Sequence, residues 1–388
     1  MNNTADVVVA GGGVMGCSIL YNLASMGMRQ ALLLESGTLA GGSTGRSMAI
    51  LRMHYSNEVT ARMAWESLAV FRHFEEVTGG PSGYVRTGYL LVAQPEYGRA
   101  LRENVAMQQR VGVDTAVVDA DGMVPMASGW FTFSEGEACA YEPESGYADP
   151  YLVATGYARK AQEMGAAVRT GTPVGSIEVE DGKVAGVVTG DGRVATRTVV
   201  VATGVWSQPM LAALGVDVPL ECVRHQVVTL RRPSEALPDH PTIGDVVNGL
   251  SARPDSAGLT LVGVGEEPVP SPDGYNQGVD WIAMEDSTKR LVARMPRLAG
   301  AYYRGGWSGL FDVTPDWHPV LGRVEGIEGL YLAVGFSGHG FKLSPMVGQT
   351  MAELIVKGET TIDVSILGLD RFRTGNLMRS KYPLAVLA

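Results

Sequence analysis

A glycine-rich segment and one acidic residue have the types and spacing of a dinucleotide-binding site. Gly11–Gly16 reads Gly-Gly-Gly-Val-Met-Gly and fits the pattern GxGxxG. In this pattern the first glycine permits a tight turn, the second lets a pyrophosphate approach the backbone, and the third allows a helix to pack closely on a strand. Glu35 follows Gly16 by 19 residues, where a carboxylate can accept hydrogen bonds from ribose hydroxyls. The alternative is an ordinary strand–helix turn with a surface glutamate.

Two later apolar runs that end in small residues favour FAD over NAD as the dinucleotide. Thr198–Gly204 reads TVVVATG, so that a strand ends in the turn Ala202-Thr203-Gly204. Gly329–Gly340 reads GLYLAVGFSGHG and predicts a second strand that leads through glycines into a helix. The N-terminus of that helix would stabilise the negative charge that develops on a flavin when it is reduced. Each pattern alone is common, and together with Glu35 they predict an FAD site.

These motifs need a parallel sheet whose strand ends meet, and the hydrophobic patterns supply such elements. Asp149-Pro150 is a typical helix start, because Asp is a good N-cap and Pro suits the first helical position. The segment from about 221 to 320 is expected to contain sheet and irregular structure. The predicted strands are Asp6–Ala10, Ala31–Leu34, Gly88–Ala93 and Tyr331–Val334, with a three-strand meander over Gly175–Glu180, Val184–Thr189 and Val194–Val201. The predicted helices are Cys17–Met26, Ser56–Glu76, Glu96–Arg110 and about Ser344–Lys357.

Composition excludes several classes of protein. A chain of 388 residues with 45% hydrophobic and 19% charged residues is folded and is long enough for two domains. The net charge is −10 and no basic cluster is present, so nucleic acid is not expected as a partner. The three cysteines lie far apart and the histidines have no zinc-binding spacing, so no metal site is expected. Without a signal-peptide pattern or a long apolar run, we expect no transmembrane segment and a cytoplasmic location.

From these motifs the chain resembles the amine-oxidising flavoproteins related to D-amino acid oxidase. The likeness is strongest to the sarcosine oxidases and the β subunit of L-proline dehydrogenase, and glycine oxidase is a more distant relative. The most specific stretch is Gly335–Ser344, GFSGHGFKLS. The other matching stretches are Gly42-Ser43-Thr44, Tyr147-Ala148-Asp149-Pro150, Thr314-Pro315-Asp316 and Asp363-Val364-Ser365-Ile366.

The resemblance implies an α/β fold of mixed α+β character. We expect a Rossmann-like FAD-binding domain and a discontinuous substrate-binding domain built on a mostly antiparallel sheet. The expected FAD-binding domain comprises residues 1–75, 145–220 and 325–388. The expected substrate-binding domain comprises residues 76–144 and 221–324.

The resemblance also implies the residues of the site. Arg52 and Lys342 match two cations that hold a substrate carboxylate by charge-assisted hydrogen bonds; the alternative is that both are solvated surface charges. Tyr55, Phe311 and His54 are expected to line the substrate pocket, although Phe311 also suits a core and His54 a surface. No residue is assigned as a catalytic acid or base. The residues expected to bind FAD are Gly11, Gly13, Val14, Met15, Gly16, Glu35, Ser43, Thr44, Val174, Ala202, Thr203, Gly204, Gly335, Gly338, His339, Gly340, Phe341 and Lys342.

Three departures from the family pattern have chemical consequences. Gly309 stands where monomeric sarcosine oxidase has the cysteine that tethers FAD, so non-covalent FAD is expected. Phe311 replaces a carboxylate-binding arginine of glycine oxidase and D-amino acid oxidase, so Arg52 and Lys342 are the residues expected to bind the substrate carboxylate. Thr260 is the best match for the lysine with which sarcosine oxidases promote attack by oxygen. Because threonine cannot supply that positive charge, a dehydrogenase function remains an alternative to an oxidase function.

The predicted function is flavin-dependent oxidation of the C–N bond of a secondary or N-substituted α-amino acid, such as an N-alkylglycine. The resulting imine is hydrolysed by water, and oxygen is expected to accept the electrons and yield H2O2. One alternative is a dehydrogenase or electron-transfer subunit, like the L-proline dehydrogenase β subunit, with an electron-acceptor partner. Another is a glycine or D-amino acid oxidase. A non-catalytic FAD-binding protein is disfavoured because the two implied cations would then lack a purpose.

Overall fold

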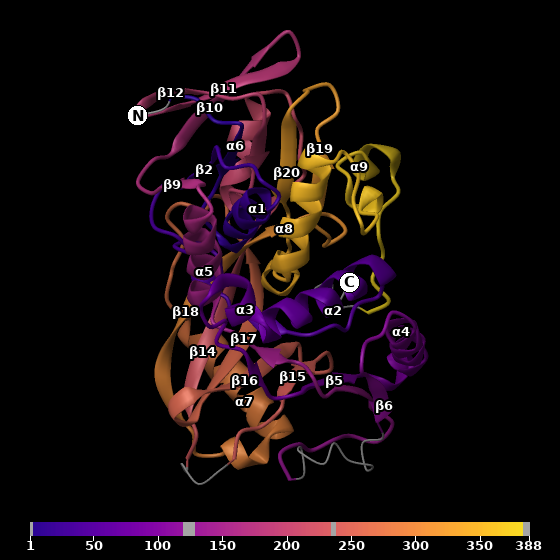
Figure 1. The fold of residues 1–388 in the computed structure, drawn as a ribbon. Helices are drawn as coiled ribbons and strands as arrows, with labels where there is room; N and C mark the ends of the chain where they lie inside the picture. The colour runs from indigo at the N-terminus through magenta and orange to yellow at the C-terminus, as the bar shows by residue number, and fades with distance from the viewer. Residues whose placement is uncertain (1–2, 119–128, 234–237, 383–388) are drawn as a thin grey trace.

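A six-stranded sheet forms the centre of one half of the computed structural model, which describes residues 3–118, 129–233 and 238–382 (Figure 1). Its strands are parallel except for β19, which runs antiparallel to β20. The strand order is β19 (Val320–Arg323), β20 (Leu330–Val334), β13 (Val199–Val201), β1 (Val7–Ala10), β2 (Ala31–Leu34) and β9 (Ala167–Arg169). β1, β2 and β13 are buried along their whole length, as their continuous apolar sequences require of strands covered on both faces.

Helices cover one face of this sheet and a small meander covers the other. α8 (Gly340–Val356) and α5 (Pro150–Glu163) pack on either side of α1 (Val14–Ser25), and Val7, Val9 and Leu33 point into this helical layer (Figure 1). The meander consists of β10 (Val174–Glu180), β11 (Lys183–Thr189) and β12 (Gly192–Ala195). Val8 and Leu32 point toward it, because successive side chains on a strand alternate between faces.

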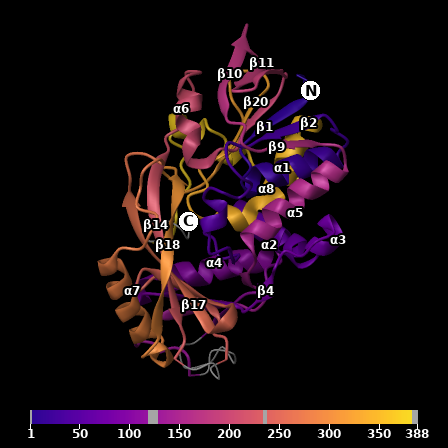
Figure 2. The same ribbon diagram turned by 90° about the vertical axis from the view of Figure 1, so that its left-hand side faces the viewer.

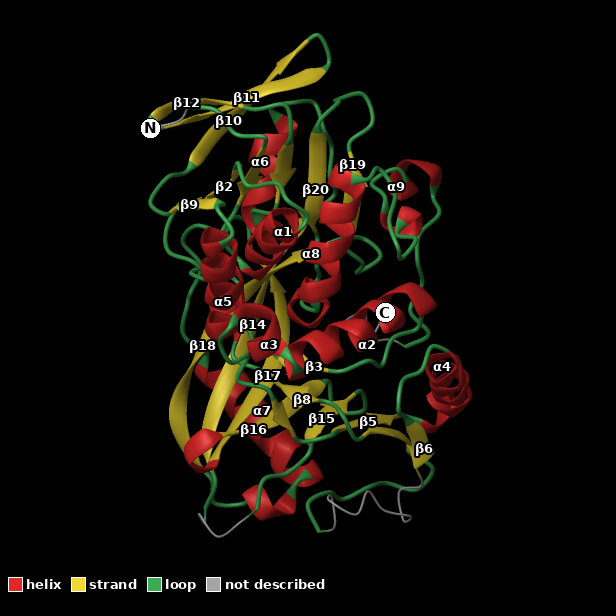
Figure 3. Cartoon of the chain, viewed as in Figure 1, coloured by secondary structure: helices red, strands yellow, loops and turns green. Residues whose placement is uncertain are grey.

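An eight-stranded sheet forms the other half of the molecule (Figures 2 and 3). Its strand order is β18 (Tyr302–Val313), β14 (Glu221–Arg231), β17 (Leu259–Pro268), β16 (Leu250–Asp255), β15 (Thr242–Asp245), β5 (Tyr89–Ala93), β7 (Ala138–Glu142) and β6 (Ala116–Val118). All neighbouring strands are antiparallel except β5 and β15. α7 (Trp281–Arg294) packs on one face through Met284 and Leu291, and α4 (Gly98–Arg110) packs through Leu101 and Val105 near β5.

Short elements join the two halves. A three-stranded sheet contains β3 (Ile50–Leu51), β8 (Gly146–Tyr147) and β4 (Val85–Arg86). The remaining helices are α2 (Glu58–Arg72), α3 (Phe74–Thr78), α6 (Ser207–Ala212) and α9 (Arg371–Thr374). In the described ranges, no helix combines the length and the apolarity that crossing a membrane requires.

The predicted α/β class is confirmed, and so is the helix start at Asp149, whose carboxylate accepts hydrogen bonds from the N–H groups of Tyr151 and Leu152. The exact domain boundaries stay a prediction. β5, β6 and β7 lie within the predicted segment 76–144, and β14 to β18 lie within 221–324. However, β19 also lies within 221–324 and belongs to the six-stranded sheet.

Four element predictions need correction. The helix expected over Ser56–Glu76 breaks at His73, which lets Phe74 pack edge-on against Tyr157. The strand expected over Val194–Val201 divides into β12 and β13, because the Thr196 hydroxyl accepts a hydrogen bond from the Thr198 N–H and forms a turn. The helix α7 was not predicted, since exposed Trp281 and Ile282 blur its apolar stripe. α8 begins at Gly340, four residues before the predicted start.

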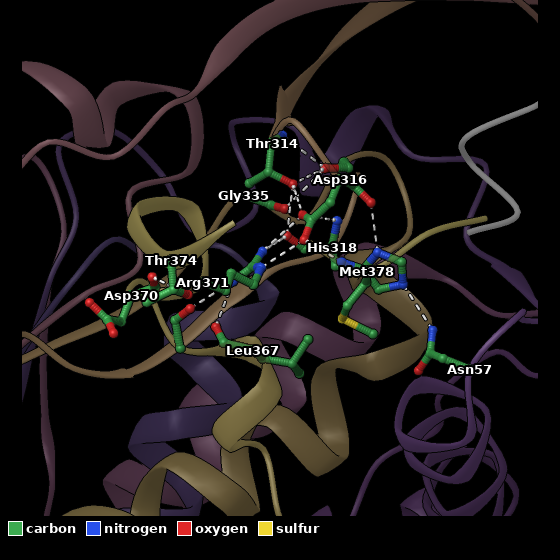
Figure 4. A network of polar contacts seen from close by, with 12 residues as sticks. Asn57, Thr314, Asp316, His318, Gly335, Leu367, Asp370, Arg371, Thr374 and Met378 are labelled. Atoms are coloured by element: carbon green, nitrogen blue, oxygen red, sulfur yellow. Dashed lines mark hydrogen bonds and ion pairs between the residues drawn. The ribbon is translucent and has the colours of Figure 1, made fainter. Parts of the chain in front are cut away.

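A buried ion pair fastens α9 to the turn between β18 and β19 (Figure 4). The Arg371 guanidinium donates to both carboxylate oxygens of Asp316, at 2.8 and 3.0 Å, and to the carbonyl oxygen of His318 at 2.7 Å. The Thr314 hydroxyl donates to the same carbonyl oxygen, at 2.8 Å. Burial alone would raise the pKa of Asp316, but the hydrogen bonds and charge of Arg371 outweigh it and hold the pKa below its ordinary value.

Replacing Arg371 with methionine would leave Asp316 as a buried, unpaired carboxylate. We expect the free energy of unfolding to fall by about 3–5 kcal/mol in a denaturant titration near pH 7. Because the folded-state pKa of Asp316 is depressed, the stabilisation is present above about pH 4 and is lost as the pH falls through the folded-state pKa. The difference between parent and variant should therefore shrink in acid. Arg62→Met, at an exposed pair with Glu58, is the control and should change stability by less than about 0.5 kcal/mol.

Candidate active site

One cavity of about 980 Å³ runs from the ends of the parallel strands to the eight-stranded sheet. Glu35, Gly13 and Thr44 line one part of it, and Arg52 and Lys342 line another. Its size lies at the upper end of the range of about 300–1,000 Å³ for ligand pockets. The cavity is therefore large enough to receive a sizeable cofactor together with part of a small substrate.

The glycines at the end of β1 allow three backbone segments to touch. A Cβ on Gly16 would lie 1.9 Å from the Gly11 carbonyl oxygen, and a Cβ on Gly11 would lie 2.4 Å from the Ala202 carbonyl oxygen. Gly11 also has a φ of 109°, which favours glycine. The N-cap of α1 is Gly13, which offers no side-chain cap, and the first turn carries no acidic residue. This helix N-terminus faces the cavity and suits a pyrophosphate.

Glu35 lies at the end of β2 in the orientation that ribose binding requires. One carboxylate oxygen accepts from the Gly12 N–H at 2.6 Å, and the other accepts from the Gly37 N–H at 2.7 Å. The oxygen bonded to Gly37 also accepts from the Ser36 hydroxyl at 3.1 Å, so the oxygen bonded to Gly12 is the one with a further lone pair for a ribose hydroxyl. Thr44 lies nearby, where its hydroxyl accepts from the Val14 N–H at 3.0 Å. These contacts hold the start of α1 against Glu35 and against the segment that carries Thr44.

The turn between β20 and α8 brings a second helix N-terminus to the cavity. Gly338, with a φ of 80°, lies against the Phe311 ring and leaves no room for a side chain. The Asp312 carboxylate accepts from the Gly335 N–H at 2.6 Å and so holds the turn. Burial raises the pKa of Asp312 to about 6, although hydrogen bonds from backbone N–H groups of this turn oppose the shift. The backbone N–H groups at the N-termini of α1 and α8 fit the pyrophosphate and the flavin ring of FAD.

Arg52 and Lys342 place two buried cations in the cavity wall, with exposed fractions of 5% and 6%. The Arg52 guanidinium lies 4.7 Å from the centroid of the Tyr55 ring and donates to the His54 carbonyl oxygen. Lys342 Nζ donates to the His339 carbonyl oxygen at 3.4 Å. Burial lowers the pKa of Lys342 well below its ordinary value, and the charge of Arg52 lowers it further. A bound anion would relieve this repulsion.

Glu142 is the carboxylate that contributes opposite charge to this cluster. It is buried and accepts hydrogen bonds from the Met53 N–H at 2.9 Å and the Ser145 hydroxyl at 2.6 Å. Burial raises the pKa of Glu142, while these hydrogen bonds and the charges of Arg52 and Lys342 oppose the shift. Through Met53, Glu142 holds the strand end that carries Arg52.

Most of the residues predicted for FAD and substrate line the cavity, and five do not. Gly16 and Gly335 lie behind the lining and shape the turns. The His339 ring lies between Tyr55 and His318, with ring centroids 5.7 and 6.1 Å away. His54 Nε2 lies 2.8 Å from the Tyr382 hydroxyl, and burial, followed by the charge of Arg52, lowers its pKa to about 3. The roles of His54, Tyr55 and His339 stay predictions.

The match of Thr260 to the oxygen-activating lysine is not supported by its position. Thr260 is buried outside the cavity lining and its hydroxyl lies 3.0 Å from His240 Nε2. On the same strand, Gly263, Gly265 and Glu266 line the cavity instead. The sequence match was loose in this segment, and only the pairing of β17 with β14 decides which residues face inward.

Tyr89, His225 and Arg290 are among the lining residues that were not predicted. The His225 ring stacks on Phe311 with centroids 4.8 Å apart, and its Nδ1 donates to the Gly265 carbonyl oxygen at 2.8 Å. Burial lowers the pKa of His225 to about 4, so it is neutral near pH 7. No short motif marks these residues, because they reach the cavity through strand pairing or, for Arg290, through a helix that was not predicted.

Comparison with known proteins agrees with this geometry. The family described as "DAO: FAD dependent oxidoreductase" matches residues 6–354. A 4-methylaminobutanoate oxidase (formaldehyde-forming) from Paenarthrobacter nicotinovorans is 28% identical over 94% of this chain and 45% of its own length. The chain thus spans less than half of that relative.

Two further relatives match nearly end to end. The sarcosine oxidase subunit beta of Rhodobacter capsulatus is 26% identical over 96% of this chain and 90% of its own length. The crystal structure of L-proline dehydrogenase from P. horikoshii superposes with a TM-score of 0.89 at 28% identity, covering 97% of this chain and 100% of that one. The resemblance inferred from the motifs is therefore confirmed at the level of family and fold.

Gly16→Ala tests the contact on which the cofactor site depends. The new Cβ would overlap the Gly11 carbonyl oxygen and push α1 away from β1. We expect the purified variant to retain less than about a tenth of the parent's FAD, measured by flavin absorbance per chain, because a shift of this size costs more than about 1.4 kcal/mol. Gly190→Ala is the matched control, since nothing lies within 4 Å of its added Cβ. Full flavin content in Gly16→Ala would contradict the assignment.

Proposed function

The chain belongs to the family of FAD-dependent oxidoreductases, and on this premise we propose that it oxidises the C–N bond of a secondary or N-substituted α-amino acid. The observation that carries the proposal is the pair of buried cations, Arg52 and Lys342, in the wall of the cofactor cavity. Bound FAD supplies the two-electron acceptor for such a reaction. The protein's own task is to bind and orient the substrate and to limit access of water.

Other buried arginines are already committed to protein partners. Arg224 pairs with Glu267 at 2.9 Å and with Asp280 at 2.5 Å. Arg253 donates to the Met48 carbonyl oxygen at 2.7 Å and pairs with Asp255 at 3.2 Å. Arg52 also has protein partners, so it is position that separates them: neither Arg224 nor Arg253 is among the cavity-lining residues, whereas Arg52 and Lys342 are. Arg52 and Lys342 are therefore better placed to hold a substrate carboxylate.

The two cations also favour the reactive form of the substrate. Positive charge beside the amine lowers the pKa of its ammonium form, so the neutral amine with its free lone pair is favoured. Phe311, stacked on His225, supplies apolar surface on the β18 side of the cavity, and Val227 on the neighbouring strand β14 adds to it. We therefore propose a substrate larger than sarcosine, whose imine product is hydrolysed by water.

Lys342→Met should weaken carboxylate binding without loss of cofactor. We expect the dissociation constant of the best N-alkylglycine or proline substrate to rise by a factor that corresponds to about 2–4 kcal/mol, the cost of truncating one partner of a buried charge pair. Arg52→Leu should behave likewise, and the two losses should not add, because both cations hold one group. Anaerobic flavin reduction across a substrate titration gives the constants.

The control is Lys357→Met, which removes an exposed lysine just after α8. It should bind substrate as the parent does. Amines without a carboxylate should bind the parent poorly and lose little more in Lys342→Met or Arg52→Leu. If both of these variants bind amino-acid substrates as tightly as the parent, the carboxylate site lies elsewhere.

A second candidate is a dehydrogenase that passes electrons to an acceptor other than oxygen. The observation that favours it is β17, which is described in full and carries no lysine toward the cavity. The similarity to L-proline dehydrogenase also supports this candidate.

Reoxidation of the reduced protein separates the two candidates. The protein is first reduced by substrate without oxygen. We then expect air to restore the oxidised flavin spectrum about tenfold more slowly than a redox dye does. A tenfold difference in rate corresponds to a contribution of about 1.4 kcal/mol from the lysine that β17 lacks. Stopped-flow absorbance gives both rates, with H2O2 measured in parallel. Stoichiometric H2O2 formed at the rate of turnover would instead establish an oxidase.

A further inference from the structure

We propose that the Tyr89 hydroxyl is a third hydrogen-bond donor to the substrate carboxylate, alongside Arg52 and Lys342. This inference rests on the proposed function and adds a residue that no motif indicated. Tyr89 is the first residue of β5, is 2% exposed, and lines the cavity together with both cations.

A glycine on the neighbouring strand makes room for the Tyr89 side chain. β5 and β15 run parallel, with Tyr89 opposite Thr242 and Leu91 opposite Gly244. A Cβ on Gly244 would lie 2.0 Å from the Tyr89 hydroxyl oxygen and 2.9 Å from the ring carbon that carries it. The ring therefore extends along the sheet across Gly244, and any larger residue there would displace the hydroxyl.

The Tyr89 hydroxyl forms no hydrogen bond with the described residues, and neither does the hydroxyl of buried Tyr55, whereas the hydroxyls of Tyr84 and Tyr382 have partners. The Tyr84 hydroxyl donates to the Glu144 carbonyl oxygen at 2.6 Å, and the Tyr382 hydroxyl lies 2.8 Å from His54 Nε2. A polar group left unpaired in the interior costs about 1–3 kcal/mol, so a ligand that pairs with it gains affinity. Tyr89 lines the cavity, and we infer that a bound molecule reaches its hydroxyl.

The electrostatic surroundings make Tyr89 a donor rather than an acceptor. Burial raises the pKa of Tyr89, and the charge of Arg52, which lines the same cavity, opposes this shift. Tyr89 thus keeps its proton near neutral pH. Glu142, which holds the backbone next to Arg52, is the cross-strand partner of Tyr89 on β7. β7, which carries Glu142, therefore holds both the strand of Tyr89 and the backbone next to Arg52.

The test is the affinity of Tyr89→Phe for carboxylates. Sarcosine, L-proline and acetate are titrated anaerobically against the flavin spectrum of the holoprotein. We expect Tyr89→Phe to raise the dissociation constant of each bound carboxylate about ten- to a hundredfold, the range for a hydrogen bond to a charged group. FAD content should equal that of the parent. Gly244→Ala, which displaces the hydroxyl, should raise the same constants.

Two controls separate the possible outcomes. Tyr84→Phe removes a hydroxyl bonded to Glu144 away from the cavity and should leave the constants unchanged. If Tyr89→Phe binds carboxylates as the parent does while Lys342→Met binds them weakly, Tyr89 is only an apolar wall and the inference is wrong. If the parent binds none of the three carboxylates, the proposed function itself fails.

Discussion

Backbone segments from β1, α1 and β13 touch without intervening side chains, and the whole site depends on that contact. Gly16 meets the Gly11 carbonyl oxygen, and Gly11 meets the carbonyl oxygen of Ala202. Because α1 can lie this close, its N-terminus, where the N-cap residue Gly13 has no side chain, faces the cavity. The position of the helix in turn sets where Glu35 and the α8 turn lie. A side chain at Gly11 or Gly16 would therefore affect parts of the site that it never touches.

Charge is distributed along the cavity in the order in which a dinucleotide and an amino acid need it. At one end, Glu35 accepts hydrogen bonds, as ribose hydroxyls require. Between the ends, helix N-termini offer N–H groups to phosphate and to the flavin. At the other end, Arg52 and Lys342 offer positive charge, and Glu142 limits their repulsion without entering the cavity lining. The same cavity therefore discriminates its two ligands by polarity as well as by shape.

Local sequence predicted the parts of the site that are made by single turns. The Gly11–Gly16 loop and Glu35 follow a spacing that is set within one strand–helix–strand unit, and Lys342 lies in the most specific matching stretch. Tyr89 and His225 could not be predicted, because they face the cavity only through the register of long strands from distant segments. The match of Thr260 to the family lysine is not supported for the same reason, because strand pairing places Thr260 outside the cavity lining. α7 was missed because tertiary packing, and not its weak apolar pattern, makes it a helix.

The position of β20 has a consequence for the order of synthesis. β20 lies between β13 and β19, and α8, which follows it, packs against α1. On a ribosome, β1 and β13 emerge long before β20, so one edge of β13 is unpaired until β20 is made. Tyr382 must then still reach His54, beside Arg52. The cofactor site is therefore complete only after β20 and α8 are made, and until then the exposed edge of β13 is open to pairing with other chains.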